Sequence, residues 1–465
     1  TPERVLMQTK FWRRAALATA LSGCLFSIAH AQSVTGYIYG QAPAGAGSSV
    51  VVRNLGTGAT RTLPVDANGR YRVSDLPNGR YSVELRRDGA TVTTQNDVAV
   101  KIASGTEVSF AGGKATDLDG IVVRAASMAS IDVSQVDTRT VFSYEDLRSL
   151  PLPRDITAVA LLAPGAIASN SYSGVPSFGG SAASENAYYI NGFAVTNPLT
   201  SIGSTTLPFE AIAQEQVLTG GYGADFGRST GGVVNIVTRR GTNEWKAGAY
   251  EIWSPESLRA SPRNMYYANT GHFTANDPRG AAYQTDGKLY QYRNKNNSWQ
   301  NTTGAYVGGP IVQDKLFFFV NGEFTKTDGT SARYATNTSP ANLTRGWNEY
   351  TYEYPRWTAK IDWNITDNHV IELTGVSDVT KYDAEYYSFD YNKFTHGDVQ
   401  TGGISTKEDS KLYIGKYTGY LTDNLTLSAL YGRQKIEHSQ GLYNYDASCP
   451  YISAGTLSLI HISEP

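Results

Sequence analysis

Residues that commonly build metal sites and disulfides are scarce in this sequence. The 465 residues include two cysteines, Cys24 and Cys449, and six scattered histidines. No C-x-x-C pair occurs, and a mature chain without Cys24 holds one thiol and no internal disulfide. His369 and Glu372 match an H-x-x-E spacing, but residues three apart on a strand face opposite sides. The sequence therefore predicts no metal site.

Charge and nucleotide-binding motifs are scarce as well. Charged residues make up 18% of the chain and the formal net charge is -2, so nothing favours a nucleic-acid partner. The Gly-Tyr-Gly run at 221–223 lacks the strand-first setting of a dinucleotide loop, and no Gly-Lys-Ser/Thr phosphate loop is present. No paired catalytic groups are found, so the chain is predicted not to be an enzyme and to use no cofactor.

Long apolar runs are missing after the N-terminal segment. No stretch of about 20 apolar residues follows it, which predicts a mature chain without a transmembrane helix. Barrel strands have a far weaker hydropathy pattern, so residence in a membrane stays open. What the chain has in abundance is glycine, with 46 residues, and tyrosine, with 31. That balance is common in strand-rich chains with interfacial aromatic residues.

The first 31 residues have the features of a signal peptide. Met7 is the expected start, basic residues follow it, and residues 15–28 form a short apolar core. An A-x-A site predicts cleavage between Ala31 and Gln32. An L-S-G-C lipobox is the alternative, and it would leave Cys24 as a lipidated N-terminus. On either alternative the protein leaves the cytoplasm.

Residues 33–113 are predicted to form a small all-β sandwich. Short strands and turn residues recur at a spacing of about ten residues, with Asn-Gly at 68–69 and 78–79, where turns need positive φ. Asp66 fits such a turn better than a calcium loop, which needs more carboxylates. The run DANGRYRVSDLPNGRYSVEL resembles the carboxypeptidase-regulatory-like sandwich, a family that carries no peptidase site.

Residues 134–241 are predicted to form an α+β domain, called the plug below. Ser143 is a predicted helix N-cap, and a second helix, ITAVALLA, follows Asp155 and ends at Pro-Gly. AYYINGFAV predicts a hairpin with its turn at Asn191 and Gly192. A glycine-dense run then leads into the strand VVNIV, which indicates tight turns and close backbone approach. The positions of this run are Gly220, Gly221, Gly227, Gly231, Gly232 and Asn235.

These landmarks resemble, in the same order, the plug of the TonB-dependent receptors of bacterial outer membranes. The matching features are the helix ending in Pro-Gly, the Asn-Gly hairpin and the closing GG-x-x-N-I-x-T. Two features depart from the family. Asn191 stands where Asp is commoner, and residues 178–186 lack the arginine of the Ile-Arg-Gly segment that many plugs carry. Because this arginine is missing, the ion pair between plug and wall cannot be copied from siderophore receptors.

The segment that joins the sandwich to the plug, 114–127, resembles a TonB box, the peptide that such receptors present to the inner-membrane energy transducer. Asp119 precedes the β-branched run Ile121, Val122 and Val123. An extended apolar peptide of this kind adds to a sheet edge of its partner through backbone hydrogen bonds. Taken alone, the segment fits an ordinary packed strand better; its place directly ahead of the plug favours the box.

From 242 to 456 the pattern predicts part of a barrel wall. Polar and apolar side chains alternate over 356–365, and in a barrel the apolar ones face lipid. Short turns and long polar stretches, such as 327–353 and 381–410, are typical of the two ends of such barrels. Seven strands are expected near 244–253, 301–309, 315–326, 355–364, 369–378, 411–420 and 425–437.

The fold class is therefore predicted as mainly β: a small sandwich, an α+β plug and the first part of a transmembrane β-barrel. The resemblance implies 22 strands in the whole barrel, so the chain is expected to be a truncated, N-terminal fragment. Its last residues, 457–465, break the tyrosine-rich alternation and are expected to be an artefactual tail.

The resemblance also implies a function. A receptor of this family imports a substrate across the outer membrane of a Gram-negative bacterium, with its N-terminal domain in the periplasm. The implied partners are the TonB–ExbB–ExbD complex, outer-membrane lipid and an unidentified extracellular ligand, which is a peptide, protein, glycan or chelate. The sandwich ahead of the plug resembles the Oar-like branch. Two alternatives stay open: a SusC-like glycan importer, and a passive structural or adhesive barrel.

Overall fold

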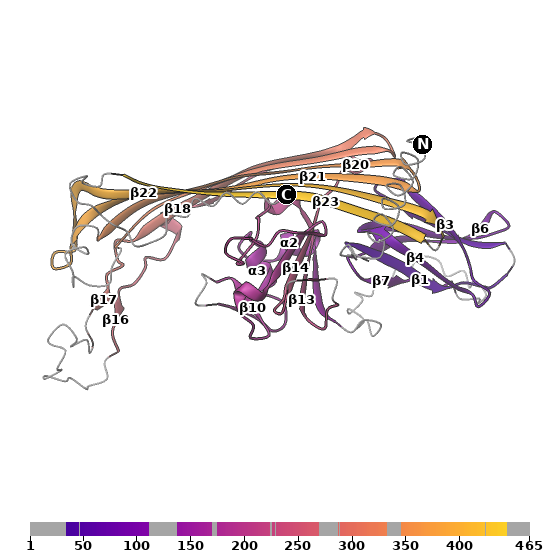
Figure 1. Cartoon of the computed structure of the whole chain (residues 1–465), viewed down its shortest axis with the longest axis horizontal. Helices are drawn as coiled ribbons and strands as arrows, with labels where there is room; N and C mark the ends of the chain where they lie inside the picture. Colours follow the sequence, from indigo (N-terminus) through magenta and orange to yellow (C-terminus); the bar gives the residue numbers. More distant parts are fainter. Residues whose placement is uncertain are drawn as a thin grey trace, which may run out of the picture.

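The computed structural model describes residues 34–443 apart from gaps at 46, 111–136, 170–173, 224–225, 228, 269–286, 288, 333–345 and 424. Three units follow one another along the chain: a sandwich, the plug and a long seven-stranded sheet, called the wall below (Figure 1). The predicted fold class, mainly β with a plug between a sandwich and a strand array, is confirmed. The predicted signal peptide, the 114–127 segment and the 457–465 tail lie outside the described residues.

The sandwich consists of two antiparallel-rich sheets packed around one apolar core. Its two sheets have the orders β4-β1-β7 and β3-β2-β5-β6, with fully buried Ile38, Val50 and Val83 between them. Asp66 accepts hydrogen bonds from the backbone of Asn68 and Arg70, which makes it a turn residue. The strands are β1 Thr35–Gln41, β2 Ser48–Asn54, β3 Thr60–Pro64, β4 Arg70–Pro77, β5 Gly79–Arg87, β6 Ala90–Val100 and β7 Gly105–Glu107.

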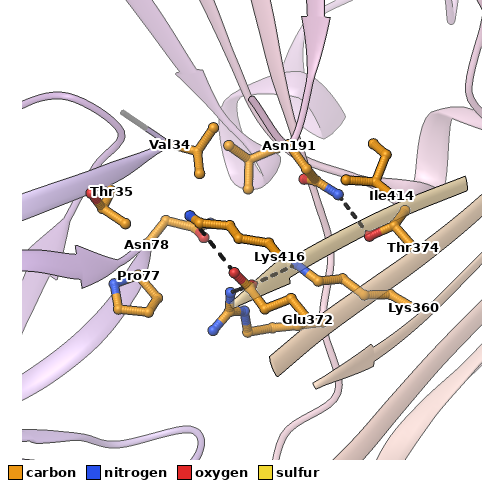
Figure 2. Close-up of a pocket in the computed structure, with 12 residues that line it drawn as sticks. Val34, Thr35, Pro77, Asn78, Asn191, Lys360, Glu372, Thr374, Ile414 and Lys416 are labelled. Carbon is orange, nitrogen blue, oxygen red and sulfur yellow. Dashed lines mark hydrogen bonds and ion pairs between the residues drawn. The ribbon is translucent and has the colours of Figure 1, made fainter. Parts of the chain in front are cut away.

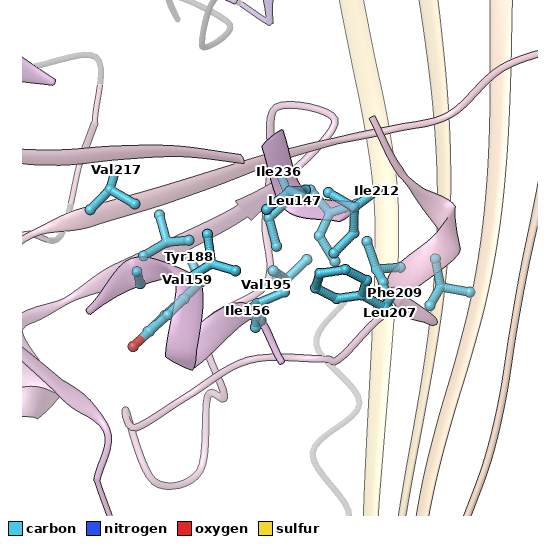
Figure 3. Close-up of a cluster of buried hydrophobic side chains, with 14 of the residues drawn as sticks. Leu147, Ile156, Val159, Tyr188, Val195, Leu207, Phe209, Ile212, Val217 and Ile236 are labelled. Carbon is cyan, nitrogen blue, oxygen red and sulfur yellow. The ribbon is translucent and has the colours of Figure 1, made fainter. Parts of the chain in front are cut away.

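The plug is a five-stranded mixed sheet with two short helices against it. The strand order is β12-β11-β14-β13-β8, and β11 runs parallel to β14. Side chains from the helices and the sheet meet in one apolar core (Figure 3), which includes Leu147, Ile156, Tyr188 and Ile236. The elements are β8 Thr138–Ser143, α2 Tyr144–Ser149, α3 Ile156–Ala160, β9 Ala166–Ala168, β10 Pro176–Phe178, η1 Ala183–Glu185, β11 Ala187–Ile190, β12 Phe193–Ala194, η2 Phe209–Ala211, β13 Ile212–Gly220 and β14 Val233–Thr238.

The two plug helices begin where the sequence predicts. Ser143 caps α2 in a capping box with Asp146, and the Asp155 side chain accepts from Thr157 N to cap α3. The second helix is shorter than predicted: it ends at Ala160, three residues before the end of ITAVALLA. The chain leaves the helix through a turn that ends at Gly165, whose φ of +78° places it in the left-handed region. No helix among the described residues has both the length and the apolar character to cross a bilayer.

The wall is an antiparallel meander in which the strands pair in chain order. Alternate side chains of β20 face opposite sides: Lys360 is 2% exposed against the plug, whereas Trp363 is 47% exposed on the outer face. This is the alternation predicted for 356–365. Each of the seven expected segments coincides with one wall strand. The strands are β15 Lys246–Ser254, β18 Asn297–Val312, β19 Leu316–Ala332, β20 Trp347–Thr366, β21 His369–Asp390, β22 Thr395–Thr422 and β23 Leu425–Tyr443.

The long polar stretch 381–410, predicted as a loop, is largely strand, whereas the middle of the stretch 327–353 lies outside the described residues. Residues 381–410 form the far halves of β21 and β22, joined by a turn at 391–394. Tyr352 and Tyr382 pair across β20 and β21 with ring centroids 4.5 Å apart, and such cross-strand aromatic contacts extend the ladder. The prediction of a long loop at 381–410 was wrong, because a strand with one polar face resembles a loop in polarity. Short elements outside the wall are η3 Glu256–Leu258, β16 Met265–Tyr266 and β17 Leu289–Gln291.

Candidate functional site: the plug–wall junction

Arg240 is the first charged contact between the plug and the wall. It follows β14, where the chain leaves the plug, and its Nη2 lies 2.6 Å from Glu372 Oε1 on β21. A second carboxylate, Asp362 on β20, lies 3.7 Å from the same nitrogen. Burial alone would lower the pKa of Arg240, but the two carboxylates raise it above the ordinary value. The guanidinium therefore stays charged within the junction.

Three neighbouring wall strands complete this group, called the charge cluster. Lys360 Nζ lies 3.1 Å from Glu372 Oε1 and 3.6 Å from Asp362 Oδ1, and Lys416 Nζ lies 3.8 Å from Glu372 Oε2. Strand register brings them together, because Glu372 is opposite Asp362 on one side and Lys416 on the other. Removing one member of a buried ionic group leaves an uncompensated charge, which costs about 3–5 kcal/mol.

The hairpin turn of the plug makes a second contact with the wall. Asn191 and Gly192 have φ values of +49° and +83°, the geometry that favours Asn-Gly in a tight hairpin. The Asn191 Nδ2 donates to Thr374 Oγ1 on β21 at 3.0 Å and to Thr238 Oγ1 at 2.8 Å. Its Oδ1 accepts from Thr238 N at 3.0 Å. One side chain thus fixes the turn and joins it to the wall.

The plug loop that contains Thr205 and Thr206 forms the third contact with the wall. Thr206 N donates to Asp378 Oδ2 at 2.7 Å, and Asp378 is itself paired with Arg356 at 2.7 Å. The Thr205 hydroxyl lies 2.7 Å from the Ser410 hydroxyl. This loop therefore lies against β21 and β22 through polar groups.

Glu210 organises the fourth contact. Its carboxylate accepts from Arg154 Nη2 and Tyr144 Oη, both at 2.6 Å. Burial raises the pKa of Glu210, but the Arg154 and Tyr144 hydrogen bonds outweigh it and the net shift is downward. Arg154 lies 5.0 Å from the ring centroid of Tyr250 on β15, and Arg239 lies 4.5 Å from that of Tyr306 on β18. These are cation–π contacts across the plug–wall boundary.

The plug–wall junction is therefore mainly polar and charged, with a smaller apolar part. Among the described residues, the wall contributes Val376, Leu412 and Ile414 to the buried plug core, and the partly buried Leu430 packs against it.

Comparisons with known proteins agree with this architecture. A family model for the carboxypeptidase regulatory-like domain matches residues 33–112, and one for the TonB-dependent receptor plug domain matches 131–234. The chain carries the plug of a TonB-dependent receptor. It is 27% identical over 273 residues to the TonB-dependent transporter Oar of Myxococcus xanthus, a match that covers 56% of this chain and 23% of that protein. The resemblance predicted from the sequence, an Oar-like receptor with an N-terminal regulatory-like domain, is confirmed.

Solved structures of the receptor family also match. The outer-membrane transporter YddB of Escherichia coli has a TM-score of 0.39 and 15% identity, covering 66% of this chain and 48% of YddB. The R480A mutant of the ferric enterobactin receptor PfeA of Pseudomonas aeruginosa, in complex with enterobactin, has a TM-score of 0.41 and 15% identity. That match covers 65% of this chain and 41% of PfeA. The chain thus spans less than half the length of these relatives.

The glycine run of the plug divides into close contacts and open positions. A Cβ on Gly232 would overlap the Phe178 ring, and one on Gly231 would lie 2.6 Å from Asn186 Oδ1. Gly221 has a φ of +70°. In contrast, a Cβ on Gly220 or Gly227 would meet nothing within 4 Å, so the expected close approach is not seen there. Asn235 is fully buried, and its Nδ2 lies 3.4 Å from Gln216 Oε1.

The remaining predicted site residues lie outside the described part of the receptor. They are the TonB-box residues Asp119, Ile121, Val122 and Val123 and the cleavage-site residues Ala31 and Gln32. Within the described ranges, no group of three or more His, Cys, Asp or Glu side chains is placed to hold a metal ion.

Sequence reasoning missed Arg240 as the plug-to-wall ion partner. It looked for an arginine within 178–186, and the charge comes instead from the residues that follow GG-x-x-N-I-x-T. The Arg-Arg pair at 239–240 was the available signal, since two cations directly after a buried strand need partners.

Proposed function

We propose that this receptor imports an extracellular ligand across the outer membrane of a Gram-negative bacterium, and that force from TonB opens its plug. The observation that carries the proposal is the polar character of the plug–wall junction. Charged and hydrogen-bonding groups can exchange their protein partners for water when a plug moves. An interface sealed mainly by apolar packing would expose that surface to water instead, at about 25 cal/mol per Å². Arg240 with Glu372 is the central contact of this kind.

The point where force would enter supports the same mechanism. The segment that contains Asp119, Ile121, Val122 and Val123 lies directly before β8 in the chain. This strand is at one edge of the plug sheet and pairs only with β13 among the described strands. A pull on the segment would therefore reach an edge strand first, and its ladder bonds can break one after another.

The turns of the wall support an orientation for it in the membrane. The turns at 313–315 and 367–368 are short, and outer-membrane barrels have their short turns on the periplasmic side. The sandwich lies at this end of the wall (Figure 1). We therefore assign the sandwich to the periplasm, where TonB would meet the segment that follows it. The outer face of β20, with Trp357, Ile361 and Trp363 exposed, would contact lipid.

The test is calorimetric titration of a peptide covering residues 116–127 against a TonB periplasmic domain. Saturable binding is expected, because the peptide can add as a strand to a sheet edge. The matched control is the same peptide with Val122→Pro, which removes a ladder hydrogen bond and should abolish binding. No binding, under conditions where a known TonB-box peptide binds, would favour a passive structural barrel. The ligand itself is sought separately, by growth on defined peptides, glycans or chelates.

A further inference from the structure

We propose that the carboxypeptidase regulatory-like sandwich is a second closure of the pore. In its docked position it covers the charge cluster from the periplasmic side and ties the plug to the wall. It must leave this position before the plug can move. The inference rests on the proposed function for its direction of opening, but the contacts that carry it are independent of TonB.

The first contact joins the sandwich to Tyr420, at the periplasmic end of β22. The Tyr420 Oη donates to the carbonyl of Asp75 at 2.7 Å, and the Arg61 guanidinium lies 4.0 Å from its ring centroid. Arg61 also donates to Ser74 O at 2.6 Å, which holds it over the ring. Asp75 has a φ of +59°, uncommon for a residue other than glycine. The strained backbone presents its carbonyl to the wall.

The second contact lies on the first short turn of the wall. Asn243, between the plug and β15, donates from its backbone to Gly56 O at 2.8 Å. Its side chain exchanges two hydrogen bonds with Asp314, at 2.7 Å and 2.8 Å. The sandwich loop at 55–59 thus meets the 313–315 turn of the wall, and Gly58 leaves room for the Asp314 carboxylate.

The third contact joins the sandwich to the plug itself. Ile102 N donates to Gln214 Oε1 on β13 at 2.8 Å, in a buried position. Arg139 on β8 donates to the Ala103 carbonyl. Val34 and Ile102 of the sandwich also share an apolar cluster with Val237 of the plug. The sandwich therefore contacts both the plug and the wall, which must separate during the proposed transport.

A small cavity of about 20 Å³ marks the place where all three units meet (Figure 2). The sandwich contributes Val34 and Asn78 to its lining, the plug contributes Asn191, and the wall contributes Glu372 and Lys416. A cavity of this size has room for about one water molecule. The sandwich thus keeps bulk water away from the charge cluster. Undocking would admit water, and charge–charge interactions weaken as the surroundings become more polar.

Chain connectivity would apply the same pull to both closures. The described sandwich ends at Phe110 and the described plug begins at Asp137, and the predicted TonB box lies between them. Force on this segment is transmitted to the sandwich at one end and to β8 at the other. We expect the sandwich to leave first, because three small contacts hold it, whereas β8 is held by a continuous ladder with β13 and the plug by four groups of contacts with the wall.

The test is single-molecule pulling on the whole receptor in a supported bilayer. A covalent handle on Val122→Cys, in a background without other accessible thiols, makes the pull independent of TonB binding. We expect two transitions, sandwich release and then plug opening. Arg61→Ala should speed the first transition about fivefold, because it removes the cation–π contact with the Tyr420 ring. Tyr420→Phe, which keeps the ring, should have a smaller effect in the same direction.

The matched control is Tyr413→Phe, the same substitution at an exposed position of the same strand. It should leave both transitions unchanged. The proposal is overturned if β8 leaves while the sandwich stays docked, or if Arg61→Ala and Tyr420→Phe leave the first transition unchanged. Failure of the proposed function appears elsewhere, as absence of TonB binding to the 116–127 peptide.

Discussion

The side chain of Asn191 joins the plug to the wall, since its Nδ2 lies 3.0 Å from Thr374 Oγ1 on β21. The same amide also forms hydrogen bonds with the hydroxyl and the backbone N–H of Thr238 inside the plug. Replacing Asn191 by alanine removes these hydrogen bonds. It also places at a φ of +49° a residue whose side chain cannot form local hydrogen bonds. We expect the plug to lose about 4–5 kcal/mol, from about 1 kcal/mol for each of these three hydrogen bonds and about 1–2 kcal/mol for the backbone.

Urea-dependent proteolysis of the plug in the whole receptor measures this change. The control is Asn191→Gly, which tolerates the positive φ and loses only the side-chain bonds. Asn191→Gly should lose less plug stability than Asn191→Ala, and the difference should equal the backbone contribution. Equal losses would mean that the turn is not strained by alanine.

Neutralising Glu372 should loosen the plug more than any single hydrogen bond does. Glu372→Gln leaves Arg240, Lys360 and Lys416 buried around one remaining carboxylate, Asp362. The expected cost is about 3–5 kcal/mol. Ion conductance of the receptor in planar bilayers with increasing urea should show plug release at a lower urea concentration.

A matched control for Glu372→Gln is Glu385→Gln, at an exposed position of the same strand. It should leave the urea dependence of conductance as it is. The double variant Arg240→Gln with Glu372→Gln should recover part of the loss, because it removes a cation together with its partner. Strictly additive losses in the double variant would argue that the two residues act independently.

The buried carboxyl of Glu215 should make plug stability depend on pH. Glu215 on β13 is fully buried, and neither carboxyl oxygen has a hydrogen-bond partner among the described residues. Burial raises its pKa well above the ordinary value, and Asp155 adds to the shift. A raised folded-state pKa favours folding below the ordinary glutamate pKa. That contribution is lost as pH rises through the folded-state value.

Replacing Glu215 by leucine should therefore stabilise the plug at pH 8 by about 1–3 kcal/mol and flatten its dependence on pH. The measurement is the urea midpoint of plug proteolysis between about pH 5 and about pH 8. Glu145→Gln, at an exposed position in the first turn of α2, serves as control. A Glu215→Leu plug that loses stability at both ends of this range would show that the carboxyl has a partner after all.

Gly232 should not tolerate a side chain. A Cβ at this position would overlap the ring of Phe178, which is buried in the plug core. Gly232→Ala is expected to destabilise the plug by about 1–3 kcal/mol through overpacking. Gly220→Ala is the control, because a Cβ there meets nothing within 4 Å. Similar urea midpoints for the two variants would contradict the close approach at Gly232.

The wall shows what a sequence pattern can and cannot predict. The side of the sheet that Lys360 and Trp357 face follows from a period of two residues, which needs no partner to be known. The lengths of β21 and β22 did not follow, because lumenal residues such as Thr380 and Glu408 are as polar as loop residues. Cross-strand pairing carries the strands past the point where the apolar pattern fades.

The charge cluster was beyond prediction for a different reason. Arg240 meets Glu372 and Lys416 only through the register of three wall strands and the position of the plug against them. The Asn191 turn, in contrast, depends on two adjacent residues, and its Asn-Gly pattern is local. What the turn sequence does not contain is the contact with Thr374, which lies 183 residues away.

The charge cluster has a consequence for whatever passes the open receptor. With the plug in place it holds three cations and two carboxylates. Only one of the five, Arg240, belongs to the plug. When the plug departs, the wall keeps Lys360 and Lys416 against Asp362 and Glu372, two positive groups against two negative ones. Among the described residues the wall's share of the cluster is therefore neutral, and the charge that leaves with the plug is the single positive charge of Arg240.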